Sequence, residues 1–169
     1  MTTQRLILIR HAKAAASGAD DARRPLAHQG KRDAIAIGRW LREAGVTSGV
    51  AIVSTALRAV QTWTAAHQEL GADITTMHDA RLYENTVEDL LAVIREALEG
   101  TQTLVVVGHS PSIHALASDL DGGTGDRGPA HDMAGTFPPG GVAVLDVSGT
   151  WSELTVGAAT LVRFAVPRG

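Results

Sequence analysis

Two uninterrupted aliphatic runs constrain the fold of this chain more than any other feature. Leu6–Ile9 and Leu104–Val107 contain only Leu, Ile and Val. A strand that is apolar at every position must be buried on both faces, as in a parallel sheet covered by helices on each side. Segments with helical periodicity lie between such runs. The sequence therefore predicts an α/β fold with three layers, α/β/α, around a largely parallel central sheet.

The helices are predicted from their apolar periodicity and from residues that favour helix starts. One helix is expected over Gln29–Ala44, and another directly after a strand at Val50–Val53, with Ser54 or Thr55 as its N-cap. Thr86 and Asp89 have the spacing of a capping box. The apolar stripe expected after that box is Val87, Leu90, Leu91, Ile94 and Leu98. Ser110-Pro111 is interpreted as an N-cap and a first-turn proline that open a further helix.

The rest of the chain is predicted to complete the sheet around one long loop. Ile74–Met77 is expected to be a strand, and Val142–Val147 with Leu154–Val156 a hairpin around Ser148-Gly149. Residues 121–141 are rich in Gly and Pro and have no periodic pattern. A structureless loop of that length is unusual and often covers a functional site, although a mobile surface loop is the equal alternative.

Size and composition indicate one ordinary globular domain, residues 1–169. The chain has no cysteine, which excludes disulfides and thiolate metal sites, and no secretory or membrane-length apolar segment is recognisable, so a cytoplasmic protein is expected. The net charge of −3 argues against a nucleic-acid partner. Residues 1–50 contain nine Lys/Arg and four Asp/Glu, a balance of +5, which suits a local anion site.

Arginines and histidines follow three of the predicted strands. Arg10 and His11 end the first strand, Arg58 lies one turn into the helix after the second, and His109 follows Leu104–Val107. Ligands of an open parallel sheet bind beyond the carboxyl ends of its strands, so these four side chains are expected to converge. Arginine offers a planar fork of donors for phosphate oxygens, and histidine a ring-nitrogen nucleophile. The sequence therefore predicts a phosphoryl pocket.

Five segments of the chain have the character of family motifs. They are Leu8-Ile9-Arg10-His11-Ala12-Lys13, Arg24-Pro25-Leu26 with Gly30, Ser54-Thr55-Ala56-Leu57-Arg58-Ala59-Val60-Gln61-Thr62, Leu82-Tyr83-Glu84 and Val107-Gly108-His109-Ser110-Pro111. In this order they resemble motifs of the histidine phosphatase superfamily, which includes phosphoglycerate mutases. The similarity spans roughly residues 6–146, and the alanine after Arg-His resembles the small SixA-like branch of phosphohistidine phosphatases.

The resemblance implies a phosphoglycerate mutase-like fold and a role for each matching residue. His11 is expected to attack phosphorus and become phosphorylated, while Arg10, Arg58 and His109 bind the non-bridging oxygens. Glu84 is the candidate general acid for the leaving group. No cofactor and no metal are implied, because the arginines supply the positive charge. The expected partner is a phosphorylated substrate, either a phosphohistidine protein or a small phosphate ester, and neither nucleic acid nor a membrane.

Three other interpretations compete with this one. Gly108-His109-Ser110-Pro111-Ser112 approaches the nucleophile elbow of an α/β-hydrolase, which would make Ser110 the nucleophile of an esterase. A catalytically silent module that binds a phosphorylated ligand is also possible from the sequence. The third, a dinucleotide fingerprint at residues 123–128, is rejected because no strand precedes it and Pro129 follows it.

Overall fold

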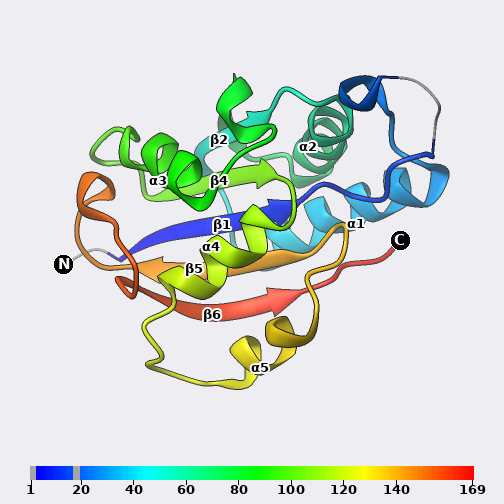
Figure 1. Ribbon diagram of the computed structural model, residues 1–169. Coiled ribbons are helices and arrows are strands. Elements are labelled where there is room, and N and C mark those ends of the chain that lie inside the picture. The colour runs from blue at the N-terminus through cyan, green and yellow to red at the C-terminus, as the bar shows by residue number, and fades with distance from the viewer. Residues whose placement is uncertain (1–2, 17–19) are drawn as a thin grey trace.

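The computed structural model of the protein describes residues 3–16 and 20–169. Its six strands form one sheet in the order β3-β2-β4-β1-β5-β6. Strands β1 to β4 are mutually parallel, and β5 alone runs antiparallel to its neighbours β1 and β6, as the arrowheads in Figure 1 show. The strands are β1 Gln4–Arg10, β2 Ser48–Ser54, β3 Asp73–Asp79, β4 Thr103–Gly108, β5 Val142–Val147 and β6 Ala159–Ala165.

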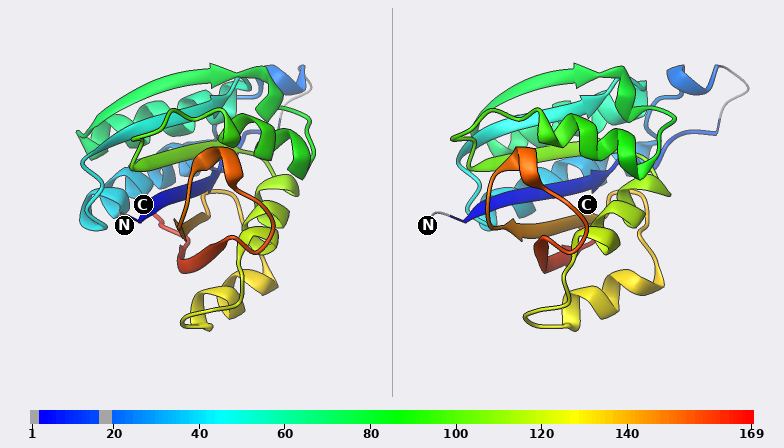
Figure 2. Two further views of the ribbon diagram at one scale, coloured as in Figure 1. Left: turned by 90° about the vertical axis from the view of Figure 1, so that its left-hand side faces the viewer. Right: turned by 60° about the vertical axis from the view of Figure 1, so that its left-hand side comes forward.

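Helices cover both faces of this sheet, which confirms the predicted α/β/α arrangement. Helices α1 (His28–Glu43) and α2 (Leu57–Leu70) pack together on one face. Helices α3 (Val87–Arg95) and α4 (Ser112–Leu120) cover the other, and α5 (Gly128–Gly135) lies against β6 (Figures 1 and 2).

Strand β1 is aliphatic at consecutive positions because both of its faces are buried. Successive side chains of a strand point to opposite faces. Leu6 and Leu8 therefore join the core beneath α3 and α4, whereas Ile7 and Ile9 join the core beneath α1 and α2. All four are at most 1% exposed, so a polar residue at any of these positions would lose its contact with water.

Two helix starts differ from the prediction. Helix α2 has Ala56 as its N-cap, without a side-chain cap, and Ser54 instead accepts a hydrogen bond from the Ala56 N–H. Helix α4 begins at Ser112 with Pro111 as its N-cap, so Ser110 does not cap it. The Ser110-Pro111 peptide bond is cis. By contrast, the capping box of Thr86 and Asp89 is confirmed, with both reciprocal hydrogen bonds present.

The chain after residue 120 also corrects the sequence analysis. The expected hairpin strand Leu154–Val156 is wrong, because a short 3₁₀ helix occupies Trp151–Glu153 and the last strand is β6. The expected loop 121–141 contains α5. Leu98, expected on an apolar stripe, lies beyond the end of α3 and is 80% exposed.

Among the described residues, no helix combines the length and the apolar character that crossing a membrane requires.

Candidate active site

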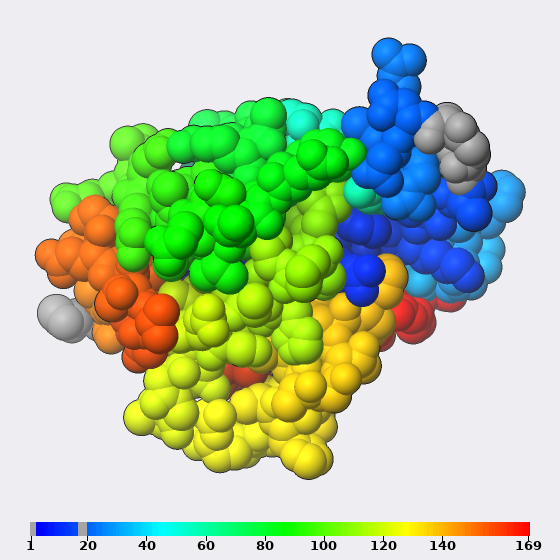
Figure 3. All heavy atoms as spheres, viewed as in Figure 1, coloured from blue at the N-terminus to red at the C-terminus, as the bar shows by residue number. Residues whose placement is uncertain are grey.

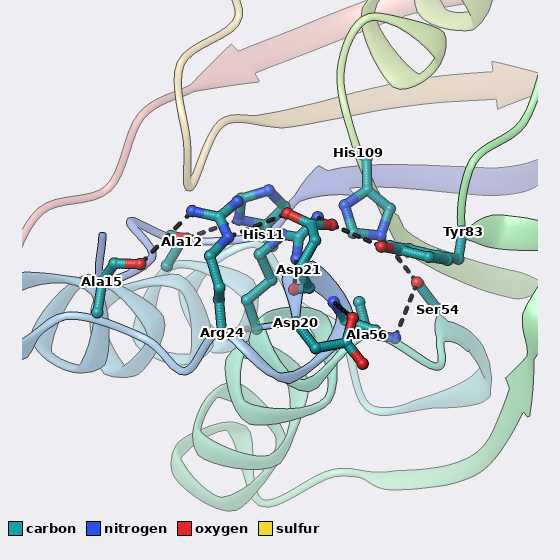
Figure 4. A network of polar contacts seen from close by, with 12 residues as sticks. His11, Ala12, Ala15, Asp20, Asp21, Arg24, Ser54, Ala56, Tyr83 and His109 are labelled. Atoms are coloured by element: carbon teal, nitrogen blue, oxygen red, sulfur yellow. Dashed lines mark hydrogen bonds and ion pairs between the residues drawn. The ribbon is translucent and has the colours of Figure 1, made fainter. Parts of the chain in front are cut away.

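The carboxyl ends of β1, β2 and β4 bring together the four residues that the sequence singled out. Arg10 is the last residue of β1 and His11 follows it, Arg58 is the second residue of α2, and His109 follows β4. The ring centroids of His11 and His109 lie 5.1 Å apart. Arg10 and Arg58 are close enough to both rings to act on their pKa values. Figure 4 shows the two rings side by side at the centre of this cluster.

His11 is held so that one ring nitrogen is free. Its Nδ1–H donates a 2.7 Å hydrogen bond to the carbonyl oxygen of Ala12, which can only accept. This contact fixes the proton on Nδ1 and leaves the lone pair of Nε2 available. Burial has the largest effect and lowers the pKa of His11 to about 4; the hydrogen bond to Ala12 opposes it, and the charges of Arg58 and Arg10 add to the lowering. The ring is therefore neutral, and nucleophilic, at neutral pH.

Residues of the segment 54–62 fix the backbone beside His11. The Ala12 N–H donates to the Thr62 hydroxyl at 3.0 Å, and that hydroxyl donates to the carbonyl oxygen of Arg58 at 2.7 Å. The Gln61 side chain accepts from the N–H of Leu26 at 2.8 Å. These contacts connect α2 to the segment that follows β1, so the helix that carries Arg58 also holds the backbone beside His11.

His109 faces the same centre from β4. Its Nε2 is 2.8 Å from the Ser54 hydroxyl, and its Nδ1 is buried. Burial, with the neighbouring His11 and Arg58, lowers the pKa of His109 to about 3. The edge of Tyr83 packs against the ring at 5.6 Å between centroids. A hydroxyl that donates to Nε2 leaves the proton on Nδ1, where it can be donated to an anion.

The two arginines are partly satisfied by carbonyl groups. Arg10 Nη1 donates to the carbonyl oxygen of Phe137 at 2.9 Å, and Arg58 Nη1 donates to that of Asp21 at 2.8 Å. Burial lowers the pKa of Arg10. Three buried donors, Arg10 Nε, Arg58 Nε and His109 Nδ1, make no hydrogen bond within the described part of the chain. An anion with several oxygens would satisfy them together.

Part of the 121–141 segment contributes to the site. Besides the Phe137 carbonyl, the Gly140 N–H donates to the carbonyl oxygens of Arg10 and His11, at 3.1 and 3.0 Å. The end of this segment therefore supports the backbone of Arg10 and His11 where β1 ends. Helix α5, earlier in the segment, packs against β6 instead.

Glu84 occupies a different position from the other four predicted residues. It is exposed, its φ angle is +45°, and its side chain makes no hydrogen bond to the four within residues 3–16 and 20–169. Its charge contributes to raising the pKa of the adjacent Tyr83, after the larger effect of the hydrogen bond between Tyr83 and Asp21. Glu84 therefore lies on the solvent side of the site, beside Tyr83.

Asp21 was not predicted as a site residue, and no roles were predicted for Arg24 and Tyr83. Both Arg58 and Tyr83 donate to the Asp21 carboxylate, at 3.1 and 2.6 Å, and Arg24 donates to its other oxygen at 3.0 Å (Figure 4). The Arg24-Pro25-Leu26 motif was a signal for this segment. Nothing in one sequence indicated that the aspartate three residues earlier contacts Arg58.

Ser110 lacks the contacts of an esterase nucleophile. Its hydroxyl is buried and makes no hydrogen bond in the described chain, while His109 Nε2 contacts Ser54 instead. A serine nucleophile requires a base within hydrogen-bonding reach. The site does not favour the esterase interpretation.

Relatives of known sequence and structure resemble the whole chain. Protein MT1313 of Mycobacterium tuberculosis is 40% identical over 162 residues, which is 95% of this chain and 100% of that protein. Protein ML1117 of Mycobacterium leprae is 34% identical over 145 residues, which is 86% of this chain and 88% of that protein. A structure from Nakamurella multipartitia assigned as the phosphohistidine phosphatase SixA has a TM-score of 0.86 and 30% identity, covering 99% of this chain and 98% of its own. A structure from Agrobacterium tumefaciens, also assigned as the phosphohistidine phosphatase SixA, has a TM-score of 0.79 and 27% identity, covering 99% of both chains.

The fold and the site together define a phosphatase of the α/β class, built around a buried, neutral histidine. The family model of the histidine phosphatase superfamily (branch 1) matches residues 6–91. The chain belongs to this superfamily, and its resemblance to the SixA-like branch is confirmed. It is therefore an enzyme, which argues against the silent binding module.

Proposed function

We propose that the chain is a phosphohistidine phosphatase in which His11 is the nucleophile. Its similarity to proteins assigned as SixA supports this substrate class. The observation that carries the proposal is the set of three buried donors without partners, Arg10 Nε, Arg58 Nε and His109 Nδ1, beside the free Nε2 of His11. Buried donors are rarely left unpaired, so their clustering favours a phosphoryl group as the missing partner.

In the proposed reaction, His11 Nε2 forms a bond to phosphorus while the bond from phosphorus to the leaving atom breaks. The electron pair of the broken bond stays with the leaving group. Arg10, Arg58 and His109 bind the non-bridging oxygens, where preorganised donors stabilise the charge of the transition state. The Ala12 carbonyl continues to accept from Nδ1–H, which stabilises the ring as it gains positive charge. A water molecule then attacks phosphorus, releases inorganic phosphate and a proton, and regenerates neutral His11.

Glu84 remains the proposed general acid for substrates with poor leaving groups. It is exposed beside Tyr83, where a leaving group would reach solvent. A cytoplasmic phosphorylated protein is the proposed partner. The exposed flank of the site, where the side chain of Asp21 is 52% accessible, suits a protein loop as well as a small molecule.

The first experiment tests whether hydrolysis of each of three substrates depends on His11 or on Ser110. The parent protein and the His11→Ala and Ser110→Ala variants are compared on p-nitrophenyl phosphate, p-nitrophenyl acetate and a phosphohistidine peptide. The proposal expects phosphate release that His11→Ala abolishes and Ser110→Ala preserves, with the phosphohistidine peptide among the better substrates. Hydrolysis of p-nitrophenyl acetate that depends on Ser110 would overturn the proposed function. Failure to hydrolyse the phosphohistidine peptide would also overturn it.

A further inference from the structure

The Asp21 carboxylate is the only acidic side chain bonded to the predicted phosphate clamp within the described residues. Oδ2 accepts from Arg58 Nη2 at 3.1 Å and from the Tyr83 hydroxyl at 2.6 Å, and Oδ1 accepts from Arg24 Nε at 3.0 Å. These three donors come from different parts of the chain and converge on one aspartate (Figure 4). A carboxylate at this position is unexpected, because its charge opposes the binding of a phosphate anion.

The position of Asp21 relative to His11 suggests what the carboxylate does. His11 is 8% exposed and forms the floor of the site, whereas the side chain of Asp21 is 52% exposed. Residues 20–24 project from the surface beside the segment that carries Tyr83 (Figure 3). The attacking and leaving atoms lie on opposite sides of phosphorus in an in-line transfer. A leaving group therefore departs towards solvent, on the side where Asp21 is held.

The chemistry of phosphohistidine gives a carboxylate there a use. An imidazole leaves readily as a neutral ring only if its second nitrogen already carries a proton, since otherwise it departs as a much more basic anion. A hydrogen bond from that second N–H to a carboxylate favours the protonated ring. His11 itself has this arrangement on the attacking side, where Nδ1–H donates to Ala12. The alcohol leaving group of a phosphate ester has no such N–H.

We infer that Asp21 is a specificity-determining residue that accepts a hydrogen bond from the second ring N–H of a phosphohistidine leaving group. This inference rests on the proposed function. The P–N bond breaks and its electron pair goes to the leaving nitrogen. The proton on the other ring nitrogen stays there, bonded to the Asp21 carboxylate. The products of this step are a neutral imidazole and phosphorylated His11, so no external acid is consumed.

The protonation state of Asp21 fits an acceptor and not a donor. Hydrogen bonds from Tyr83 and Arg58 lower the pKa of Asp21 to about 2, with Tyr83 having the larger effect. The carboxylate is therefore ionised whenever the enzyme works and cannot protonate an alkoxide.

The test compares two substrates in two aspartate variants. Asp21→Asn removes the charge and keeps the shape of the side chain. Asp20→Asn makes the same change one residue earlier, at a side chain that bonds only the Ala22 N–H and the guanidinium of Arg23 within the described residues. The ratio of kcat/KM for a phosphohistidine peptide to kcat/KM for p-nitrophenyl phosphate is measured for each, together with inhibition by vanadate.

The inference expects Asp21→Asn to lower this ratio by about tenfold or more, the scale of one hydrogen bond to a charged group. Vanadate should inhibit this variant at least as strongly as it inhibits the parent, because a competing anion has been removed. Asp20→Asn should leave both readouts unchanged. An unchanged ratio in Asp21→Asn would overturn the inference while leaving the proposed function standing. Equal loss on both substrates with weaker vanadate inhibition would also overturn it, because Asp21 would then only orient Arg58.

A parent protein that hydrolyses p-nitrophenyl phosphate through His11 but not the phosphohistidine peptide would overturn both the proposed substrate class and the role of Asp21. That result is distinct from a failure of the inference alone, which appears only in the variants.

Discussion

The two site histidines differ in what holds them, and this difference assigns their tasks. His11 donates from Nδ1 to a carbonyl oxygen, so its free Nε2 can attack. His109 contacts the Ser54 hydroxyl through Nε2, and its Nδ1 has no hydrogen-bond partner among the described residues, as the proposed role in anion binding requires. Both rings are shielded from water and stand beside guanidinium groups, which disfavour a third positive charge. The same surroundings that make His11 a free base therefore also make the centre attractive to an anion.

The first prediction concerns the protonation of these rings. With pKa values lowered to about 4 for His11 and about 3 for His109, both should be neutral at pH 5, when a histidine of the unfolded chain is protonated. Unfolding therefore takes up protons, and the free energy of unfolding should fall as the pH decreases from about 6.5 towards 4. Nitrogen-15 NMR titration of the ring nitrogens, assigned with His11→Asn and His109→Asn, measures the pKa values directly. Titration of either ring near pH 6.5 in the folded protein would contradict this account.

The second prediction tests Glu84 by the choice of leaving group. If Glu84 protonates an alkoxide, Glu84→Gln should slow hydrolysis of an alkyl phosphate by about 10²–10⁴-fold. Hydrolysis of p-nitrophenyl phosphate or phosphohistidine should change little, because those leaving groups need no external proton. The control is Glu88→Gln, an exposed carboxylate in the first turn of α3. Equal losses on all three substrates would show that Glu84 has a structural role instead.

At the level of elements, the strands buried on both faces were easier to predict than the strand at the edge of the sheet. The aliphatic runs in β1 and β4 could only be buried strands, and this fixed the parallel core of the sheet. Strand β6 was missed because Thr160 and Arg163 interrupt its apolar residues, as is usual for a strand at the edge of a sheet. Leu154 was predicted as a strand residue because it is apolar. It is buried for a different reason, since the 3₁₀ turn that begins at Trp151 packs on α3 and carries Leu154 into the core.

For the site, too, the residues next to buried strands were easier to predict than those in irregular segments. Residues that follow buried strands could be placed at one edge, so Arg10, His11 and His109 were predictable. The contacts of Asp21 depend on how residues 20–27 fold back over α2, which local periodicity does not encode. The antiparallel pairing of Ala14 with Leu26, and the contact of Leu26 with Gln61, make that return possible.

The third prediction concerns the contact between α1 and the segment after β1. A Cβ at Gly30 would collide with the carbonyl oxygen of Lys13, two residues beyond the nucleophile. Gly30→Ala should therefore destabilise the fold by about 1–3 kcal/mol and lower kcat, although alanine is the better helix former. Gly135→Ala in α5, where no atom outside the local helix backbone lies within 4 Å of the added Cβ, should instead be neutral or stabilising by up to about 1 kcal/mol. Urea denaturation and steady-state kinetics measure both effects, and full stability and activity of Gly30→Ala would contradict the packing argument.

Over the whole molecule, the number of charged residues in a region does not show where in the folded structure their charges lie. The excess of +5 in residues 1–50 suggested an anion site, and Arg10 lies there. Other arginines of that region are paired on the surface, since Arg39 and Arg42 both contact Glu69. The sum over a third of the chain therefore contained both the site and ordinary surface ion pairs, which only the folded structure separates.

The fourth prediction follows from where the positive charge of the site comes from. In the proposed site, Arg10 and Arg58 supply the fixed charges that bind the phosphoryl group, so we expect that no divalent cation is needed to neutralise it. Treatment with EDTA should leave kcat and KM for p-nitrophenyl phosphate unchanged. Removal of one guanidinium, in Arg58→Ala, should weaken inhibition by vanadate. Activity that disappears in EDTA and returns with Mg²⁺ would contradict this assignment.

Trapping the phosphorylated enzyme shows whether a phosphoryl group is transferred to His11. The protein is mixed with ³²P-labelled phosphohistidine peptide, quenched within milliseconds in base or in acid, and digested to locate the label. Phosphohistidine is stable in base and labile in acid, so the account predicts base-stable, acid-labile label on the peptide that contains His11. It predicts no label in His11→Ala. Turnover by His11→Ala, or label at another residue, would contradict the account.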